Sequence, residues 1–141
     1  MNGDLPEVTR SAIVRGPGLE TVMAGDALAN QRILLVEDEF FLADELARSL
    51  QAAGATIVGP AASIRNALNL IATAGHLDAA VLDLNLRGET AIPVADALLE
   101  RNVPFVFATG YGHGFVPVRY RHVKRCEKPM NPAKIVRALF G

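Results

Sequence analysis

A chain of 141 residues, half of them hydrophobic, is long enough to bury one core but not two, so we expect a single domain. The 14 lysines and arginines nearly balance the 15 aspartates and glutamates, which argues against nucleic acid or an anionic membrane as partner and favours a protein. The single cysteine, Cys126, excludes an internal disulfide and a zinc site built from several cysteines. Since no secretory signal is evident and no apolar run approaches the roughly 20 residues of a membrane helix, we expect a cytoplasmic protein.

Residues 1–31 are predicted to form an irregular extension that precedes the domain. They contain glycines and prolines throughout and show no sustained hydrophobic periodicity. A second possible start, Met23, lies close to the domain edge. Two interpretations therefore stay open: an over-long gene prediction, or an arm that packs on the domain or on a partner.

Short apolar runs begin to alternate with longer stretches of helical period at Arg32. This alternation predicts an α/β domain over residues 32–141. Nearly continuous apolar character indicates parallel strands that are covered on both faces. The five predicted strands are residues 33–36, 56–58, 79–82, 105–108 and 123–126.

Three covering helices are predicted between the first four strands. Apolar residues recur at intervals of three and four over residues 42–50, 64–71 and 94–101, and the aliphatic stem of Arg101 completes the last stripe. The predicted boundary residues are Ser63, an N-cap, and Gly54 and Gly75, which follow the first and second helices.

The C-terminal part departs from this rhythm. Residues 111–122 show no clean apolar stripe, so we expect a shortened or irregular fourth helix. The last helix is signalled by Asn131 as N-cap and Pro132 after it, and its predicted inward residues are Ile135, Val136, Leu139 and Phe140. Five parallel strands with right-handed crossovers form a doubly wound, flavodoxin-like sheet whose ligand site lies beyond the carboxyl ends of the strands.

Polar residues follow those strand ends: Glu37 and Asp38 after the first, Asp83 after the third, Thr109 after the fourth and Lys128 after the fifth. Three carboxylates at one sheet edge repel each other unless a cation lies between them. Oxygen ligands suit Mg²⁺, or another hard divalent cation such as Mn²⁺ or Ca²⁺. The lysine and the hydroxyl group can bind phosphoryl oxygens. The set predicts a site at which a carboxylate nucleophile accepts a phosphoryl group.

Four segments carry a resemblance to a known family: residues 33–39 (ILLVEDE), 81–86 (VLDLNL), 104–111 (PFVFATGY) and 127–129 (EKP). Together they resemble the receiver domains of bacterial two-component response regulators, over residues 32–141. The resemblance implies that Asp83 is the phosphoacceptor. It also implies that Asp38, Asp83 and the backbone carbonyl of Asn85 bind the metal, with Glu37 acting through a water.

The resemblance also assigns the residues around the phosphoryl group. Thr109 would be the switch hydroxyl, Lys128 its ion-pair partner, and Gly110 would leave room for the phosphoryl group and attacking water. The peptide bond between Lys128 and Pro129 would be cis, as in the family.

The run from Phe107 to Tyr111 (FATGY) is similar to that of a receiver subgroup with an altered fourth helix, in which many members are single-domain proteins. The sequence departs from the common pattern at Arg125, where most receivers have an aromatic switch residue. Tyr111 is the candidate to take over that aromatic role.

The leading functional prediction is a single-domain response regulator. It would receive its phosphoryl group from a sensor histidine kinase or phosphotransfer protein, and act on a downstream protein partner or as a phosphate relay or sink. It would not be an enzyme acting on a separate substrate. Two alternatives stay open: a receiver-like adaptor that works without phosphorylation, and a metal-dependent aspartyl phosphohydrolase, which fits less well because Asn85 stands where such enzymes have a second carboxylate.

Overall fold

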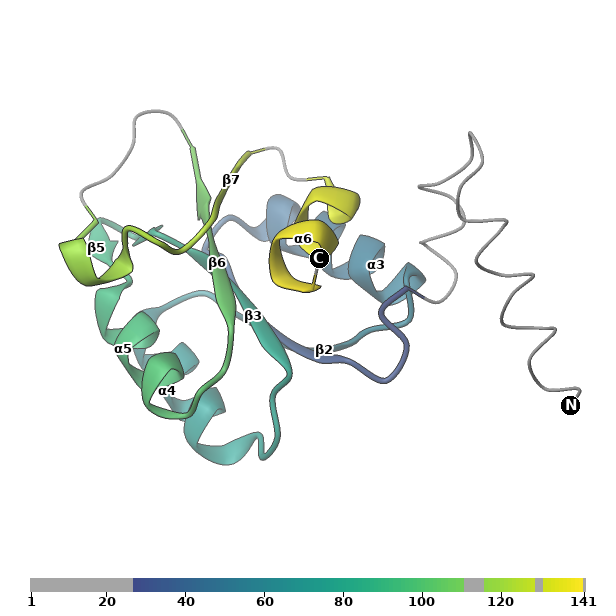
Figure 1. Cartoon of the computed structure of the whole chain (residues 1–141), viewed down its shortest axis with the longest axis horizontal. Helices are drawn as coiled ribbons and strands as arrows, with labels where there is room; N and C mark the ends of the chain where they lie inside the picture. Colours follow the sequence, from purple (N-terminus) through teal and green to yellow (C-terminus); the bar gives the residue numbers. More distant parts are fainter. Residues whose placement is uncertain (1–26, 111–115, 129–130, 141) are drawn as a thin grey trace, which may run out of the picture.

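The computed structural model describes residues 27–110, 116–128 and 131–140. Its centre is a parallel sheet of five strands in the order β2-β1-β3-β6-β7 (Figure 1). The strands are β1 (Arg32–Val36), β2 (Thr56–Ala61), β3 (Ala79–Asp83), β6 (Phe105–Thr109) and β7 (Arg125–Glu127). This order reverses direction beside β1 and confirms the predicted doubly wound fold.

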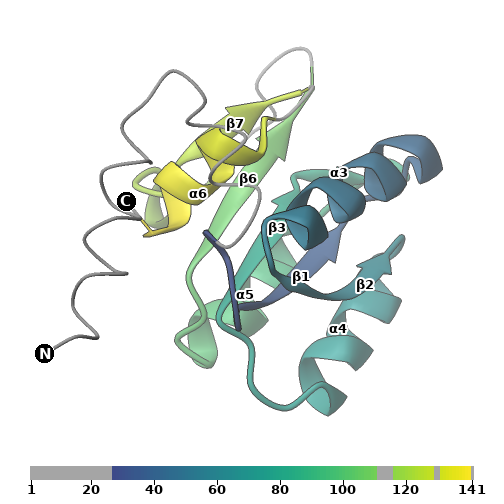
Figure 2. The ribbon, with the colours of Figure 1, turned by 90° about the vertical axis from the view of Figure 1, so that its right-hand side faces the viewer.

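Helices cover both faces of the sheet. One layer contains α3 (Phe40–Ala52) and α6 (Pro132–Phe140), and the other contains α4 (Ile64–Thr73) and α5 (Ile92–Glu100) (Figure 2). Alternate residues of β1 enter the two cores, with Ile33 packed in the α3 layer and Leu34 in the α4–α5 layer. None of the helices in the described ranges has both the length and the apolar character needed to cross a membrane.

The predicted helix boundaries rest on observed capping contacts. The Ser63 hydroxyl oxygen accepts a hydrogen bond from the Asn66 amide at 3.1 Å, and the Asn131 side-chain oxygen accepts one from the Ala133 amide at 2.7 Å. Gly54, just past α3, has φ +103°, and a Cβ there would lie 2.9 Å from the backbone nitrogen of Ala29. Only glycine therefore fits this helix end.

Two predicted core positions are wrong. Helix α5 ends at Glu100, and Arg101 lies exposed in the following turn, where its guanidinium donates to the Gly75 carbonyl at 3.4 Å. Phe140 is 43% exposed, whereas Ile135 in the same helix is fully buried. Five residues correspond to about 140° of rotation about a helix axis, so these two side chains point in different directions.

Between β6 and β7 the described residues contain a single 3₁₀ turn, η1 (Val118–Tyr120), which confirms the predicted irregular fourth helix. A small antiparallel hairpin after β3 was not predicted. It pairs β4 (Asn85–Leu86) with β5 (Glu89–Thr90). Arg87 and Gly88 form its turn with φ values of 52° and 85°.

Leu28 packs in the α3 layer of the core although the sequence places it in the N-terminal extension. Its side chain is 1% exposed, and its amide donates to the Ala53 carbonyl at 2.7 Å. Residues 1–26 of that extension lie outside the described residues.

Candidate functional site

Three carboxylates meet at the carboxyl edge of the sheet. Glu37 and Asp38 follow β1, and Asp83 ends the neighbouring strand β3, which is paired in parallel with β1. Each of the three offers an oxygen atom, and these oxygens all lie within 4.8 Å of one another. Glu37 and Asp83 are 3% and 5% exposed. Buried carboxylates this close need a cation for charge compensation.

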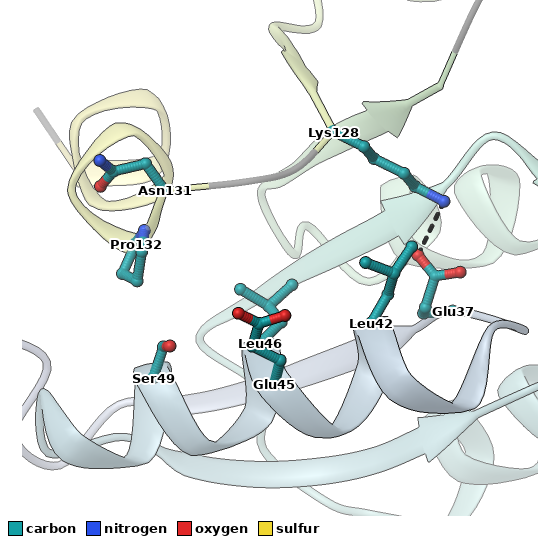
Figure 3. A pocket seen from close by; sticks show the side chains of 8 residues that line it. All are labelled: Glu37, Leu42, Glu45, Leu46, Ser49, Lys128, Asn131 and Pro132. Carbon is teal, nitrogen blue, oxygen red and sulfur yellow. Dashed lines mark ion pairs between the residues drawn. The ribbon is translucent and has the colours of Figure 1, made fainter.

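The Lys128 ammonium group supplies one positive charge. Its Nζ lies 2.8 Å from Glu37 Oε1 and 2.8 Å from Asp83 Oδ2, and its side chain is only 18% exposed. Figure 3 shows the side chain reaching from the end of β7 toward Glu37. The Lys128 amide also donates to the Thr109 carbonyl at 2.9 Å, so β6 and β7 fix the start of this side chain.

The protonation of this pair follows from burial and charge. Burial raises the pKa of Glu37, and the nearby Asp83 adds to this, although hydrogen bonds from Lys128 and the Glu39 amide oppose it. Burial lowers the pKa of Lys128, but hydrogen bonds to Asp83 and Glu37 outweigh burial and raise it above its usual value. The lysine is therefore charged, and the cluster still carries more negative than positive charge.

Backbone amides orient each carboxylate. The Glu39 amide donates to Glu37 Oε2 at 3.0 Å, and the Asn85 amide donates to Asp83 Oδ1 at 3.2 Å. The Arg87 amide, in the turn of the hairpin, donates to Asp38 Oδ2 at 2.8 Å. The three carboxylates are therefore held by the chain itself, in addition to the lysine.

The donor set fits a hard divalent cation. Closely spaced carboxylate oxygens with a shortage of positive charge are the environment that Mg²⁺, Mn²⁺ or Ca²⁺ occupies in proteins. The structure thus brings together Glu37, Asp38, Asp83 and Lys128, which the sequence predicted to converge. Asn85 lies beside them, and its side-chain oxygen accepts a hydrogen bond from the Gly88 amide at 3.0 Å.

Thr109 is the last residue of the adjacent strand β6, and Gly110 follows it. Ala108 pairs with Asp83 across β3 and β6, which places the next residue, Thr109, at the site edge with 4% exposure. Gly110 is exposed, and a Cβ added to it would meet nothing within 4 Å. Within the described residues, no atom therefore crowds the position of a Cβ at Gly110.

Three further predicted features have different outcomes. Tyr111 and Pro129 lie outside the described residues, so the predicted aromatic role and the cis peptide bond stay predictions. Arg125, at the usual aromatic position, is exposed on β7.

A groove of about 400 Å³ adjoins the site between α3 and α6. Glu37 and Lys128 form its end nearest the carboxylate cluster (Figure 3). The other lining residues are Leu42, Glu45, Leu46, Ser49, Asn131 and Pro132.

Sequence reasoning missed a buried polar contact in the α4–α5 layer of the core. Tyr120 of η1 is fully buried, and its hydroxyl donates to Asp96 of α5. Its ring packs edge-on against Phe107, 6.2 Å between centroids, and the Arg119 guanidinium lies 5.0 Å from the ring centroid. No motif marks this pair, because a lone tyrosine among polar residues in an aperiodic segment gives no sign of burial.

No protein-family model matches the sequence, and neither does any curated protein. Among solved structures, the chain is similar to SdrG from Sphingomonas melonis Fr1, with 41% identity and a TM-score of 0.69, over 79% of this chain and 97% of that one. The BeF3-activated conformation of SdrG from Pseudomonas melonis Fr1 matches with 40% identity and a TM-score of 0.68, over 80% and 98% of the two chains. A response regulator receiver protein from Sinorhizobium medicae WSM419 shares the fold at 22% identity, with a TM-score of 0.63 over 77% and 90% of the chains.

Proposed function

Because the chain belongs to the family of response-regulator receiver domains, we propose that it accepts a phosphoryl group on Asp83 in a Mg²⁺-dependent reaction. One observation carries the proposal: a buried carboxylate at the end of a central strand lies 2.8 Å from a lysine ammonium and beside two further carboxylates. A lysine with a metal-binding cluster is the combination that phosphoryl transfer to a carboxylate requires.

The reaction forms a bond between an Asp83 carboxylate oxygen and phosphorus. At the same time the bond from phosphorus to the donor breaks, and the donor atom leaves with the electron pair. The Lys128 ammonium can then turn from the carboxylate to a phosphoryl oxygen, and the Thr109 hydroxyl can donate to another.

Asp38, Asp83 and the carbonyl of Asn85 would hold the metal, with Glu37 acting through a water. When bound, Mg²⁺ supplies positive charge that neutralises the carboxylates and the phosphoryl oxygens. The residues of the chain keep the nucleophile in place: the Asn85 amide fixes one Asp83 oxygen at 3.2 Å, and Lys128 contacts the other.

We infer a signalling role in the cytoplasm of a bacterium, with a sensor histidine kinase or phosphotransfer protein as donor and a protein as downstream partner. On this proposal the chain is a phosphoacceptor and not an enzyme with a separate substrate. The FATGY run supports placing it in the subgroup of single-domain receivers with an altered fourth helix. That a relative, SdrG, has a BeF3-activated conformation supports the same activation chemistry here.

A phosphorylation-independent adaptor is the second candidate. The exposed Arg125 favours it, because an aromatic residue at this position normally links the switch hydroxyl to the surface.

Incubation with acetyl phosphate, with and without Mg²⁺, followed by intact-mass measurement tests the proposal. We expect a Mg²⁺-dependent addition of about 80 Da, the mass of one phosphoryl group, in the wild type and none in Asp83→Asn. Asp44→Asn is the matched control, since Asp44 is a surface residue of α3 paired with Arg48 at 3.0 Å. No addition, with a beryllofluoride control showing no binding either, would refute phosphoacceptance and favour the adaptor.

A further inference from the structure

The turn of the β4–β5 hairpin uses an unfavourable residue. A two-residue turn with φ of 52° and 85° at its central positions is of the type that favours Asn-Gly, because a side chain with a larger Cβ substituent is strained at positive φ. This chain has Arg87 at the first position. Because strained backbone positions cluster at functional sites, the arginine side chain is a candidate for a functional role there.

The hairpin holds Arg87 firmly at the rim of the site. Leu86 is 1% exposed in the core, and the Ala91 amide donates to the Leu84 carbonyl at 2.9 Å, which closes the base of the hairpin. The Arg87 amide lies 2.8 Å from Asp38 Oδ2. Its side chain is exposed, and its guanidinium makes no ion pair or hydrogen bond within the described residues. The backbone of Arg87 is therefore anchored next to the carboxylate cluster, and its charged side chain extends from this point into solvent.

Formal charges show what this side chain can do. Glu37, Asp38 and Asp83 bring three negative charges to this edge, and Lys128 brings one positive charge, which leaves −2. A divalent cation brings this sum to zero. An anionic phosphodonor would then meet a site with no net positive charge, and Arg87 adds one positive charge that attracts it.

We propose that Arg87 determines the acceptance of anionic phosphodonors, by binding the phosphoryl oxygens of the donor before transfer to Asp83. The inference rests on the proposed function. Arg87 exchanges no proton: with acetyl phosphate, the phosphorus–oxygen bond to the acetyl group breaks, acetate leaves with the electron pair, and the bond to the Asp83 oxygen forms. A guanidinium can hold two phosphoryl oxygens at once, which a lysine cannot.

Arg87→Gln and Arg87→Lys form the matched pair for the test, because both keep the backbone amide and the strained turn but only lysine keeps the charge. The measurement is the rate of phosphorylation against acetyl phosphate concentration at saturating Mg²⁺. We expect Arg87→Gln to raise the half-saturating donor concentration roughly 3- to 10-fold with an unchanged maximal rate, since one exposed charge is lost near a dianion. Arg87→Lys should lie between the wild type and Arg87→Gln, because it keeps the charge but loses the two-point contact.

Two further readouts separate charge from damage to the turn. The difference between wild type and Arg87→Gln should shrink as salt is raised, because exposed charges are screened. Mg²⁺ should bind Arg87→Gln as well as or better than the wild type, since a nearby cation has been removed. Arg87→Asn, which suits positive φ, should behave like Arg87→Gln.

Equal half-saturating concentrations in Arg87→Gln and wild type would overturn the inference. So would weakened Mg²⁺ binding in Arg87→Gln, which would mean that the residue only supports Asp38. A wild type that is not phosphorylated at all would refute the proposed function itself, a result distinct from either of these.

Discussion

Replacing Lys128 by glutamine should destabilise the metal-free protein and make its stability strongly dependent on Mg²⁺. The lysine contacts two carboxylates whose side chains are 2% and 7% exposed, so its loss leaves two buried negative charges close together. Removing one partner of a buried ion pair typically costs about 3–5 kcal/mol. Glu37, whose pKa is already raised by burial, can take up a proton and reduce this cost. We therefore expect a loss of about 2–3 kcal/mol at pH 7 without metal.

Urea unfolding, followed by circular dichroism, checks this prediction. The measurement is made without metal and with about 10 mM Mg²⁺, a concentration meant to exceed the dissociation constant. Mg²⁺ should restore more stability to Lys128→Gln than it adds to the wild type, because the metal no longer competes with the ammonium group. Lys134→Gln, at an exposed lysine of α6, is the control and should change stability little. An unchanged stability of Lys128→Gln without metal, or the same deficit with and without Mg²⁺, would refute the reasoning.

Two predictions concern packing in the two core layers. Tyr120→Phe should lower the free energy of unfolding by about 1–2 kcal/mol, because it removes a hydrogen bond to the Asp96 carboxylate and keeps the ring. Burial and, to a smaller extent, that hydrogen bond raise the pKa of Tyr120 above its usual value. The stability linked to the raised pKa is complete below the pKa of the unfolded state, about 10, and is lost as the pH rises through the pKa of the folded state. The free energy of unfolding, measured from about pH 8 to 11, where phenols ionise, should therefore fall less steeply in Tyr120→Phe than in the wild type. An equal fall in the two proteins would contradict the assignment. Leu28→Ala should cost about 2–4 kcal/mol, because the side chain is 1% exposed in the core. A urea midpoint equal to that of the wild type would show that Leu28 does not contribute to the core.

The central strands were predictable because both faces of the sheet are buried. Residues 33–36, 79–82 and 105–108 are continuously apolar and coincide with β1, β3 and β6 to within one residue. The edge strand β7 was predicted at 123–126 but spans Arg125–Glu127, where two of three residues are exposed. An edge strand next to solvent has no apolar run to mark it.

The convergence of Glu37, Asp38, Asp83 and Lys128 followed from topology, since the carboxyl ends of parallel strands share one edge. The contacts that hold these groups in place were not predictable. The Arg87 amide reaches Asp38 across 49 residues of sequence, from a hairpin whose two-residue strands are too short to show a period. Tyr120 and Asp96 likewise meet through the tertiary fold across 24 residues.

The support of Asp38 by a backbone amide has an evolutionary consequence. A main-chain N–H group is present in every residue except proline, so the side chain at position 87 can change over generations without removing the hydrogen bond to Asp38. Gly88, with φ of 85°, and the buried Leu86 are constrained by shape, and the φ of 52° at position 87 favours residues that tolerate positive φ, but the exposed side chain there can still differ in charge. On the proposal that Arg87 binds the phosphodonor, a single substitution at this position would change the donor preference and leave the support of Asp38 in place.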